Sequence, residues 1–228
     1  MTADFAVAKS KMDPLNDSKS LVQILEVMGN DLTVVNAARV SFSKESKELT
    51  EGDSKLIKYL ARNQHISPFF HPQIRMRLKM PIFIAREWFR HTVGFARNEV
   101  SRRYVDSEPE VYMPIELRAR DPNLKQGSKS ESIDCNESVA LIMHRAMEVS
   151  VTTYNSMLAA NVAPEVARTV LPQSMYTEFI ETASLYAYAR LCKLRLDPHA
   201  QLEIRMYADA IDKQMVAHFP VSWAALMA

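Results

Sequence analysis

The stretch PQIRMRLKMPIFIAREWFRHTVGFARNEVSRRY, residues 72–104, holds the patterns on which the predicted fold depends. From Gln73 to residue 80 the side chains alternate between polar and apolar. This period of two is typical of a strand with one face in water. Pro81 then suits the first turn of a helix over residues 82–91. A strand that runs directly into a helix is therefore predicted near the centre of the chain.

Outside this stretch the sequence predicts many helices and few strands. Two apolar runs, residues 21–29 and 175–183, indicate strands, and the polar residues 118–133 indicate a loop. Helices are expected over residues 31–42, 54–63, 137–160, 164–170, 185–196 and 198–219. Their predicted caps are Asp31, Asp53 or Ser54, and Asp197 before Pro198. Because strands and helices do not alternate regularly, we expect an α+β fold in a single domain over residues 1–228.

Composition narrows the classes of protein that the chain could represent. Its 28 basic and 27 acidic residues balance, so no global field draws it to nucleic acid or to a membrane. Cys135 and Cys192 form no CxxC pair, which fits a reducing compartment, and no apolar leader or membrane span is evident, so a cytoplasmic protein is expected. With only four glycines, neither GxGxxG nor a P-loop can be written. Any nucleotide must be held by side chains and helix ends.

Residues 89–104 carry four of the 16 arginines and predict a local anion site. Arginine presents a planar fork of donors that matches phosphate or carboxylate. A solvated basic face is the ordinary explanation for such a run, but the apolar residues within it require partial burial. Helical spacing would place Glu87, Arg90 and His91 on one face, and a turn would aim Ser101 and Arg103 at one phosphate. For Arg168 and Arg195, which lie elsewhere, a structural ion pair stays open.

Two other kinds of site are disfavoured by spacing. His65, His71 and His91 lack the helical i, i+4 spacing and the flanking carboxylates of a metal site, so no metal is expected. Cys192 lies among apolar residues of a predicted helix, where a cysteine usually only packs. The sequence therefore offers no nucleophilic cysteine.

Several ordered segments resemble one family. NEVSRRY matches the end of the RHRxxSxNExSxRY signature of flavin-dependent thymidylate synthases, and FRH matches its start. Five further segments resemble the same family in the same order, residues 27–42, 65–71, 81–91, 165–172 and 194–204. The resemblance thus covers nearly the whole chain.

That resemblance implies a methyltransferase that makes dTMP from dUMP. The methylene group would come from 5,10-methylenetetrahydrofolate, and the hydride from FAD reduced by NADPH. Family members are homotetramers with a mixed sheet, long helices and active sites shared between subunits. They use neither a catalytic cysteine nor a Rossmann fingerprint, in agreement with the residues present here. Small molecules, dUMP and folate, are thus the implied partners, with no nucleic acid and no membrane.

The resemblance also implies roles for individual residues. Arg195 matches the catalytic arginine that meets the uracil ring and favours its N3-deprotonated form. The implied dUMP contacts are Glu87, Arg90, Glu99, Ser101, Arg102, Arg103, Arg168 and Arg195. The implied FAD contacts are Ser41, His65, Ser67, Arg90, His91, Arg97, Asn98, Glu99, Ser184, Arg190 and His199, of which Ser184 and Arg190 stand where the family has asparagines.

The chain departs from the family pattern around the signature. Six residues separate His91 from Asn98 where the pattern has five, and Thr92 replaces an arginine. We hypothesise that Arg97 folds back to supply the missing guanidinium and that Gly94 permits the altered turn. Two further departures affect predicted contacts: Glu87 stands in place of a glutamine, and Phe70 stands where an acidic residue is common.

Two other classes of function remain. One is a nucleotide-binding or nucleic-acid-binding protein that keeps the fold without the catalysis, since an arginine-rich loop also suits phosphodiesters. The other is a structural oligomer whose arginines pair with acids across subunits. Bound flavin distinguishes the enzyme from both.

Overall fold

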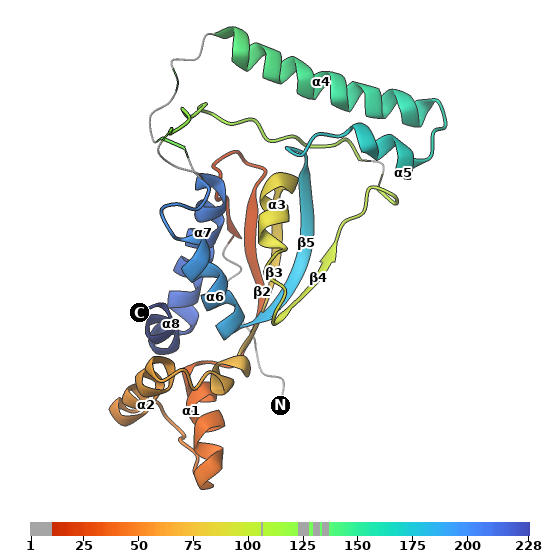
Figure 1. Cartoon of the computed structure of the whole chain (residues 1–228). Helices are drawn as coiled ribbons and strands as arrows, with labels where there is room; N and C mark the ends of the chain where they lie inside the picture. Colours follow the sequence, from red (N-terminus) through yellow and green to blue (C-terminus); the bar gives the residue numbers. More distant parts are fainter. Residues whose placement is uncertain (1–10, 106, 123–127, 130–132, 134–136) are drawn as a thin grey trace. The chain divides into compact units, whose positions relative to one another are not determined.

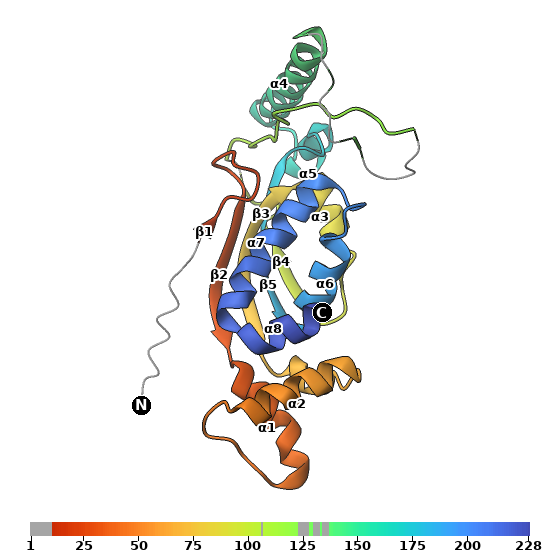
Figure 2. The ribbon, with the colours of Figure 1, turned by 90° about the vertical axis from the view of Figure 1, so that its left-hand side faces the viewer.

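The computed structural model describes residues 11–105, 107–122, 128–129, 133 and 137–228 (Figures 1 and 2). The chain forms two compact units, one from residues Met1–Leu78, His91–Asn98 and Ile180–Ala228, the other from Lys79–Arg90 and Glu99–Phe179. No described helix combines the length and the apolarity needed to cross a bilayer. Part of the loop predicted over residues 118–133, and Cys135, lie outside the described residues.

Five strands form one sheet in the order β1-β2-β3-β5-β4. Their bounds are β1 Lys11–Met12, β2 Leu21–Met28, β3 Gln73–Pro81, β4 Phe95–Glu99 and β5 Tyr176–Ser184. The three predicted strands are confirmed as β2, β3 and β5, whereas β1 and β4 were not predicted. In β3 the apolar side chains at positions 74, 76, 78 and 80 are buried, and Arg75 and Arg77 are exposed. The predicted wet face of this strand is therefore confirmed.

The first unit contains most of the helices. They are α1 Asp31–Arg39, α2 Glu51–Arg62, α6 Leu185–Arg195, α7 Leu202–His218 and α8 Pro220–Met227, with short 3₁₀ turns η1 Val40–Phe42 and η2 Ser67–Phe70. Helix α8, which was not predicted, packs against α1, α2, α6 and α7 (Figure 2). Its Trp223 is buried and donates from Nε1 to Asp212 Oδ1 over 2.7 Å. This short helix is thus a central packing element of the first unit.

The cap of α1 differs from the prediction. Asn30, not Asp31, is the N-cap, and its Oδ1 accepts from the amides of Leu32 and Thr33. Asp31 is buried and accepts instead from the amides of Val221 at 3.0 Å and Ser222 at 2.8 Å, in the first turn of α8. Helix N-termini leave amides without intrahelical partners. A carboxylate from α1 supplies those partners for α8 and fixes one helix on the other.

Three other helix ends also differ. Helix α2 is capped by Thr50, with Asp53 inside the first turn rather than before it. Helix α7 begins at residue 202 rather than 198, because Asp197 accepts from the amide of His199 at 2.8 Å and forms a local turn instead of a cap. Helix α3, Ile82–Trp88, ends three residues earlier than predicted.

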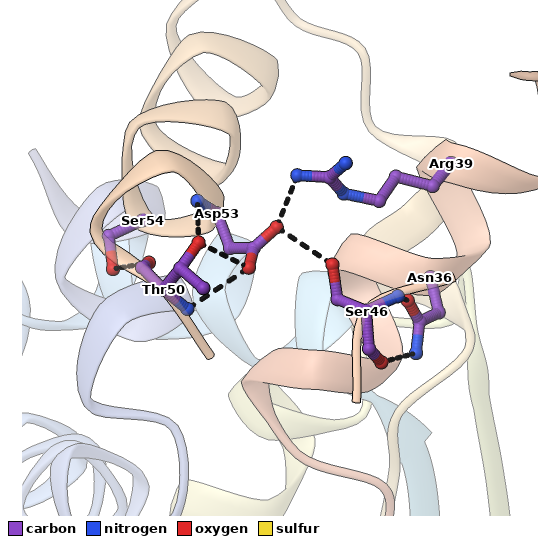
Figure 3. Close-up of polar contacts among 6 residues, drawn as sticks. All are labelled: Asn36, Arg39, Ser46, Thr50, Asp53 and Ser54. Carbon is purple, nitrogen blue, oxygen red and sulfur yellow. Dashed lines mark hydrogen bonds and ion pairs between the residues drawn. The ribbon is translucent and has the colours of Figure 1, made fainter. Parts of the chain in front are cut away.

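A buried carboxylate joins α1, α2 and the loop between them (Figure 3). Oδ2 of Asp53 accepts from the amide and the hydroxyl of Thr50 at 3.0 and 2.7 Å. Oδ1 accepts from Arg39 Nη2 at 2.5 Å and from the Ser46 hydroxyl at 3.1 Å. The side chain of Asn36 in turn holds the backbone of Ser46 through bonds of 3.0 and 2.8 Å. One acid thereby fixes both ends of an otherwise exposed loop.

The second unit contains α3, α4 Glu137–Ala159, α5 Pro164–Ala167 and the 3₁₀ turn η3 Arg168–Val170. The predicted helices over 137–160 and 164–170 are confirmed. Helix α4 packs against α5 and η3 (Figure 1), its Tyr154 is buried, and the Ser150 hydroxyl donates to the Val170 carbonyl over 2.5 Å. The amide of Ile82, at the start of α3, donates to the Met175 carbonyl just before β5 over 2.9 Å.

Asp53 generates a prediction for stability at acid pH. Its pKa is lowered from 3.8 to about 2, first by the Thr50 hydroxyl and further by Arg39 and Ser46, against burial, which raises it. A lowered native pKa stabilises the fold above the unfolded pKa, and this contribution disappears as the pH falls through the native pKa. Asp53→Asn should therefore lower the unfolding free energy by about 2 kcal/mol at pH 6. In this variant the unfolding free energy should also fall less steeply than in the parent protein as the pH decreases from about 4 to 2. Urea titrations at stepped pH measure this.

The matched control is Asp209→Asn, because Asp209 forms an exposed i, i+4 pair with Lys213. That substitution should change the unfolding free energy by less than about 0.5 kcal/mol. If both variants kept the acid slope of the parent protein, the cluster around Asp53 would not carry this linkage.

Candidate functional site

The arginine-rich stretch leaves its helix before Arg90. The Phe89 amide makes the last helical bond of α3, to Ala85 at 2.8 Å. Arg90 and His91 therefore lie in a loop that leads into β4, and the predicted helical face of Glu87, Arg90 and His91 is wrong. Gly94 turns this loop with a φ of +83°, and a Cβ at that position would lie 3.0 Å from the Ala187 Cβ. The glycine is thus needed both for its backbone angle and for close packing on α6.

Within the first unit, four polar side chains form a continuous chain. Arg97 Nε donates to Glu181 Oε2, and Arg97 Nη1 donates to the His91 carbonyl at 2.5 Å. Arg195 Nε donates to His91 Nε2 at 3.0 Å. With Nε2 as acceptor, the neutral imidazole carries its proton on Nδ1. Both the backbone and the ring of His91 are therefore fixed, and the ring fixes Arg195.

Glu181 is the member of this hydrogen-bonded series of side chains that was not predicted from the sequence. Its side chain is completely buried on β5, and that of Arg97 is only 14% exposed. A buried carboxylate requires a partner of this kind. The sequence of β5 could have revealed it. Phe179, Glu181 and Ala183 occupy alternating positions whose side chains are buried, and an acid at such a position indicates a buried cation nearby.

Aromatic rings complete the surroundings of Arg97. Its guanidinium carbon lies 4.5 Å from the Phe95 ring centroid, and Phe95 packs edge-on against Tyr188 at 5.3 Å and 81°. Burial raises the pKa of Tyr188 well above its usual value, and the charge of Glu181 adds to this effect. Arg97 does fold back across the loop, as hypothesised, and its described contacts are His91, Glu181 and Phe95. Its role towards a flavin stays a prediction.

The other predicted flavin contacts of the first unit have different surroundings. Ser184 is buried and caps α6 by accepting from the Ala187 amide at 3.2 Å. His199 lies beside Asp197 at 2.9 Å, and His65 packs edge-on against Tyr59 at 6.0 Å. The exposed members of the set are Ser41, His65, Ser67, Asn98, Arg190 and His199. Because η2 packs against α6, the hydroxyl of Ser67 and the guanidinium of Arg190 come from neighbouring elements. This donor set suits phosphate oxygens.

In the second unit, the chain from Glu99 to Tyr104 forms an anchored turn. Glu99 Oε1 accepts from the Thr177 hydroxyl at 2.5 Å, and the amide of residue 100 donates to the carbonyl of residue 178 at 2.9 Å. The Tyr104 amide donates to the Ser101 carbonyl at 3.0 Å. Ser101 Oγ accepts from the amide and Nε of Arg103 at 3.4 and 3.3 Å. The turn thus brings a hydroxyl, an amide and an exposed guanidinium together, as predicted, and phosphate binding there stays a prediction.

The remaining predicted nucleotide contacts are dispersed over the second unit. Arg102 donates to the Ser107 carbonyl, Glu87 is half-buried and Arg90 is exposed. Arg168 follows α5 as its C-cap and is exposed. Its position beyond the end of a four-residue helix turns the side chain to solvent. An exposed guanidinium there is accessible to an anionic ligand.

Metal and thiol chemistry find no support in the described residues. Within that part of the chain, no group of three or more His, Cys, Asp or Glu side chains is arranged to hold a metal. Cys192 is buried in α6, and burial raises the pKa of its thiol well above the usual value. Its thiolate form is therefore disfavoured, in agreement with the predicted packing role.

Comparisons with known proteins point in one direction. Residues 23–221 match the family model of the thymidylate synthase complementing protein. A flavin-dependent thymidylate synthase of Thermus thermophilus is 39% identical over 207 residues, covering 91% of this chain and 75% of that protein. One of Thermotoga neapolitana is 39% identical over 209 residues, covering 92% and 91%. The crystal structure of a UMP/dUMP methylase, PolB of Streptomyces cacaoi, bound with 5-Br dUMP, aligns with a TM-score of 0.80 and 33% identity, covering 90% of this chain and 93% of that chain.

The buried Arg97–Glu181 pair generates a prediction. Glu181→Gln removes the carboxylate and leaves a largely buried guanidinium without its counter-charge. Breaking a buried pair in this way costs about 3–5 kcal/mol, so the free energy of unfolding should fall by roughly that amount. Denaturant titration at pH 7 measures this fall.

The matched control is Glu26→Gln, which breaks the half-exposed pair with Arg75 at 2.7 Å. The unfolding free energy of the control should change by less than about 1 kcal/mol. Equal effects of the two substitutions would contradict the role given to the buried pair.

Proposed function

Because the chain belongs to the family of flavin-dependent thymidylate synthases, we propose that it methylates dUMP to dTMP, with 5,10-methylenetetrahydrofolate as carbon donor and NADPH-reduced FAD as hydride source. The observation in the structure that carries this proposal is the fixed Arg195–His91 contact of 3.0 Å. This contact holds a permanently charged guanidinium in one orientation, and the resemblance assigns this arginine to the uracil ring of the substrate. The PolB structures, bound with 5-Br dUMP and with 5-Br UMP, support a pyrimidine nucleotide as substrate.

The proposed task of Arg195 is electrostatic. A guanidinium stays protonated at any physiological pH and stabilises an anion that develops on the uracil ring when N3 loses its proton. Such stabilisation is effective only if the donor is already in place before the reaction. The His91 ring performs that positioning, since it accepts from Arg195 Nε and so fixes the orientation of the guanidinium group.

The proposed phosphate contacts are the exposed guanidinium groups of the second unit. Arg103 and Ser101 converge at the anchored turn after β4, and Arg168 ends α5. Paired donors of this kind suit the oxygens of a nucleotide monophosphate. Glu87, Glu99, Arg90 and Arg102 complete the proposed dUMP contacts.

The residues present fit an FAD that is held by side chains. No glycine-rich fingerprint can be written in the chain, whereas Ser67, Arg190 and the fixed His91 offer a hydroxyl, a guanidinium and an imidazole from the first unit. The further proposed flavin contacts are Ser41, His65, Arg90, Arg97, Asn98, Glu99, Ser184 and His199. When bound and reduced by NADPH, the flavin would supply the hydride that completes the methyl group.

We also propose a cytoplasmic homotetramer of one domain per chain, with active sites shared between subunits. An apolar stripe on α4 supports the assembly, because Val139, Ile142 and Val149 are 50–64% exposed on one long helix. Exposed apolar side chains at helical spacing are typical of a surface that another chain covers.

The assembly gives a prediction of its own. Light scattering after gel filtration should return about four times the chain mass of 26.0 kDa. Val149→Glu with Ile142→Glu should shift the protein to smaller species, because charges would be buried at the contact. A monomeric parent protein would contradict the assembly, as would an unchanged mass of the double variant.

The proposed reaction is tested by an anaerobic visible spectrum. FAD bound to the protein should bleach with NADPH and regain colour only when 5,10-methylenetetrahydrofolate and dUMP are both present, with dTMP formed in equal amount. Replacing dUMP by UMP in the same assay identifies the sugar that the site prefers. A flavin that bleaches but never reoxidises with these substrates would indicate a nucleotide-binding protein without the synthase reaction.

Arg195→Lys sharpens this test. Lysine keeps the charge but loses the Nε–H bond to His91 and the planar fork. Reoxidation should slow by about 100-fold, the scale of losing one preorganised donor. Lys213→Gln, at an exposed position of α7, should leave the rate unchanged. A normal rate in Arg195→Lys would remove Arg195 from the catalytic role.

A further inference from the structure

A basic pocket lies in the first unit between α2, α6 and α8. It is a cavity of about 740 Å³, within the usual size range of ligand sites. Five cationic side chains line it, Lys55, Lys58, Arg62, Arg190 and Lys193. No acidic side chain is among its lining residues. Of the five, only Arg190 is a contact that the sequence predicts, so the other four have no assigned role.

The charges of this pocket are poorly compensated within the protein. Lys55 pairs with Glu51 at 2.8 Å, in an exposed helical pair, and Lys193 Nζ donates to the backbone oxygen of Ala228 at 3.2 Å. Lys58, Arg62 and Arg190 form no ion pair within the part of the chain that the structure describes. Three uncompensated cations from two helices that converge on one cavity repel one another. An anionic ligand with several charges would relieve this repulsion.

The remaining walls of the pocket suit an aromatic ring. Tyr59 and Tyr186 line it together with small apolar side chains of α6 and α8. The Tyr186 ring is held by Phe70 at 5.2 Å and 48°, and Tyr59 is half exposed. Exposed tyrosine faces bind planar heterocycles by stacking. The pocket therefore combines a surface for a base with a set of donors for phosphates.

We propose that this pocket binds the adenosine end of NADPH, with its 2′-phosphate and its diphosphate on the cationic side chains. The inference rests on the proposed function, which requires a reductant for the flavin. A phosphate monoester carries about −1.5 to −2 at pH 7, in addition to the charge of the diphosphate, so NADPH matches several cations better than NADH does. Arg190, itself a proposed flavin contact, would place this site next to the flavin.

Binding is tested first without turnover, by calorimetry with adenosine 2′,5′-bisphosphate on the FAD-loaded protein. The parent protein should bind this probe at least about tenfold more tightly than 5′-AMP. The double variant Lys58→Ala, Arg62→Ala should lose at least about 100-fold in affinity, because each of the two charge-assisted hydrogen bonds contributes about one to two factors of ten. The double variant should fold normally, since both side chains are exposed. Lys213→Ala, an exposed cation of α7, is the matched control and should bind like the parent protein.

Kinetics then identify the occupant. In the double variant the KM for NADPH should rise about tenfold or more, the KM for NADH should change by less, and the KM for 5,10-methylenetetrahydrofolate should stay constant. A rise for folate alone would assign the pocket to the glutamate tail of folate and overturn the proposal. Loss of FAD affinity would overturn it in favour of the flavin. No probe binding to the parent protein would overturn it as well.

These outcomes are separable from the proposed reaction. A protein that binds the bisphosphate and bleaches with NADPH, but forms no dTMP, would keep the pocket assignment and lose the synthase proposal. A protein that forms dTMP with equal KM values for NADPH in the parent and the double variant would keep the synthase and lose the pocket assignment.

Discussion

The buried ion pair between Arg97 and Glu181 is the interaction on which the candidate site depends. Burying either charge alone would cost several kcal/mol, so each requires the other. The pair joins β4 to β5, and Nη1 of Arg97 then holds the His91 carbonyl in the loop before β4. The orientation of Arg195 by the His91 ring depends on this attachment, because a ring can orient a partner only if its own backbone is fixed.

The same pair explains how the chain accommodates its lengthened loop. With one extra residue and without the arginine at position 92, the loop would lack contacts that fix its conformation. Gly94 supplies the left-handed angle and the close approach to α6, and Arg97 supplies the attachment to β5. Neither device works alone, since a turn without an anchor stays mobile and an anchored arginine needs a turn that reaches it. The altered loop and the buried acid on β5 are therefore one structural solution.

The parts of the fold that sequence reasoning predicted are those with strong local patterns. The alternation in β3, the long apolar pattern of α4 and the extended run of β5 each carry their own signal. Two predicted caps failed for different reasons. Asp31 binds the amides of α8, nearly the whole chain away, whereas Asp197 closes a local turn with His199 instead of capping a helix. Helix α8 was missed because Pro220 follows Phe219 directly and a helix of eight residues has little periodicity. Among site residues, the arginines were predicted from their residue type. Glu181 could be predicted only by noticing that it occupies a buried position of β5 and therefore needs a buried cation as partner.

The structure also separates two kinds of arginine that the sequence presents alike. Arg97 is largely buried beside a carboxylate, so the pair carries no net charge and contributes little to attracting a phosphate. Arg103, Arg168 and Arg190 are exposed, and for them an incoming anion supplies the missing counter-charge. The arginine run in the opening stretch is thus not one anion site: one member holds the loop, and others remain for ligands. Because Glu181 already neutralises Arg97, holding His91 is a better-supported role for Arg97 than neutralising a flavin phosphate.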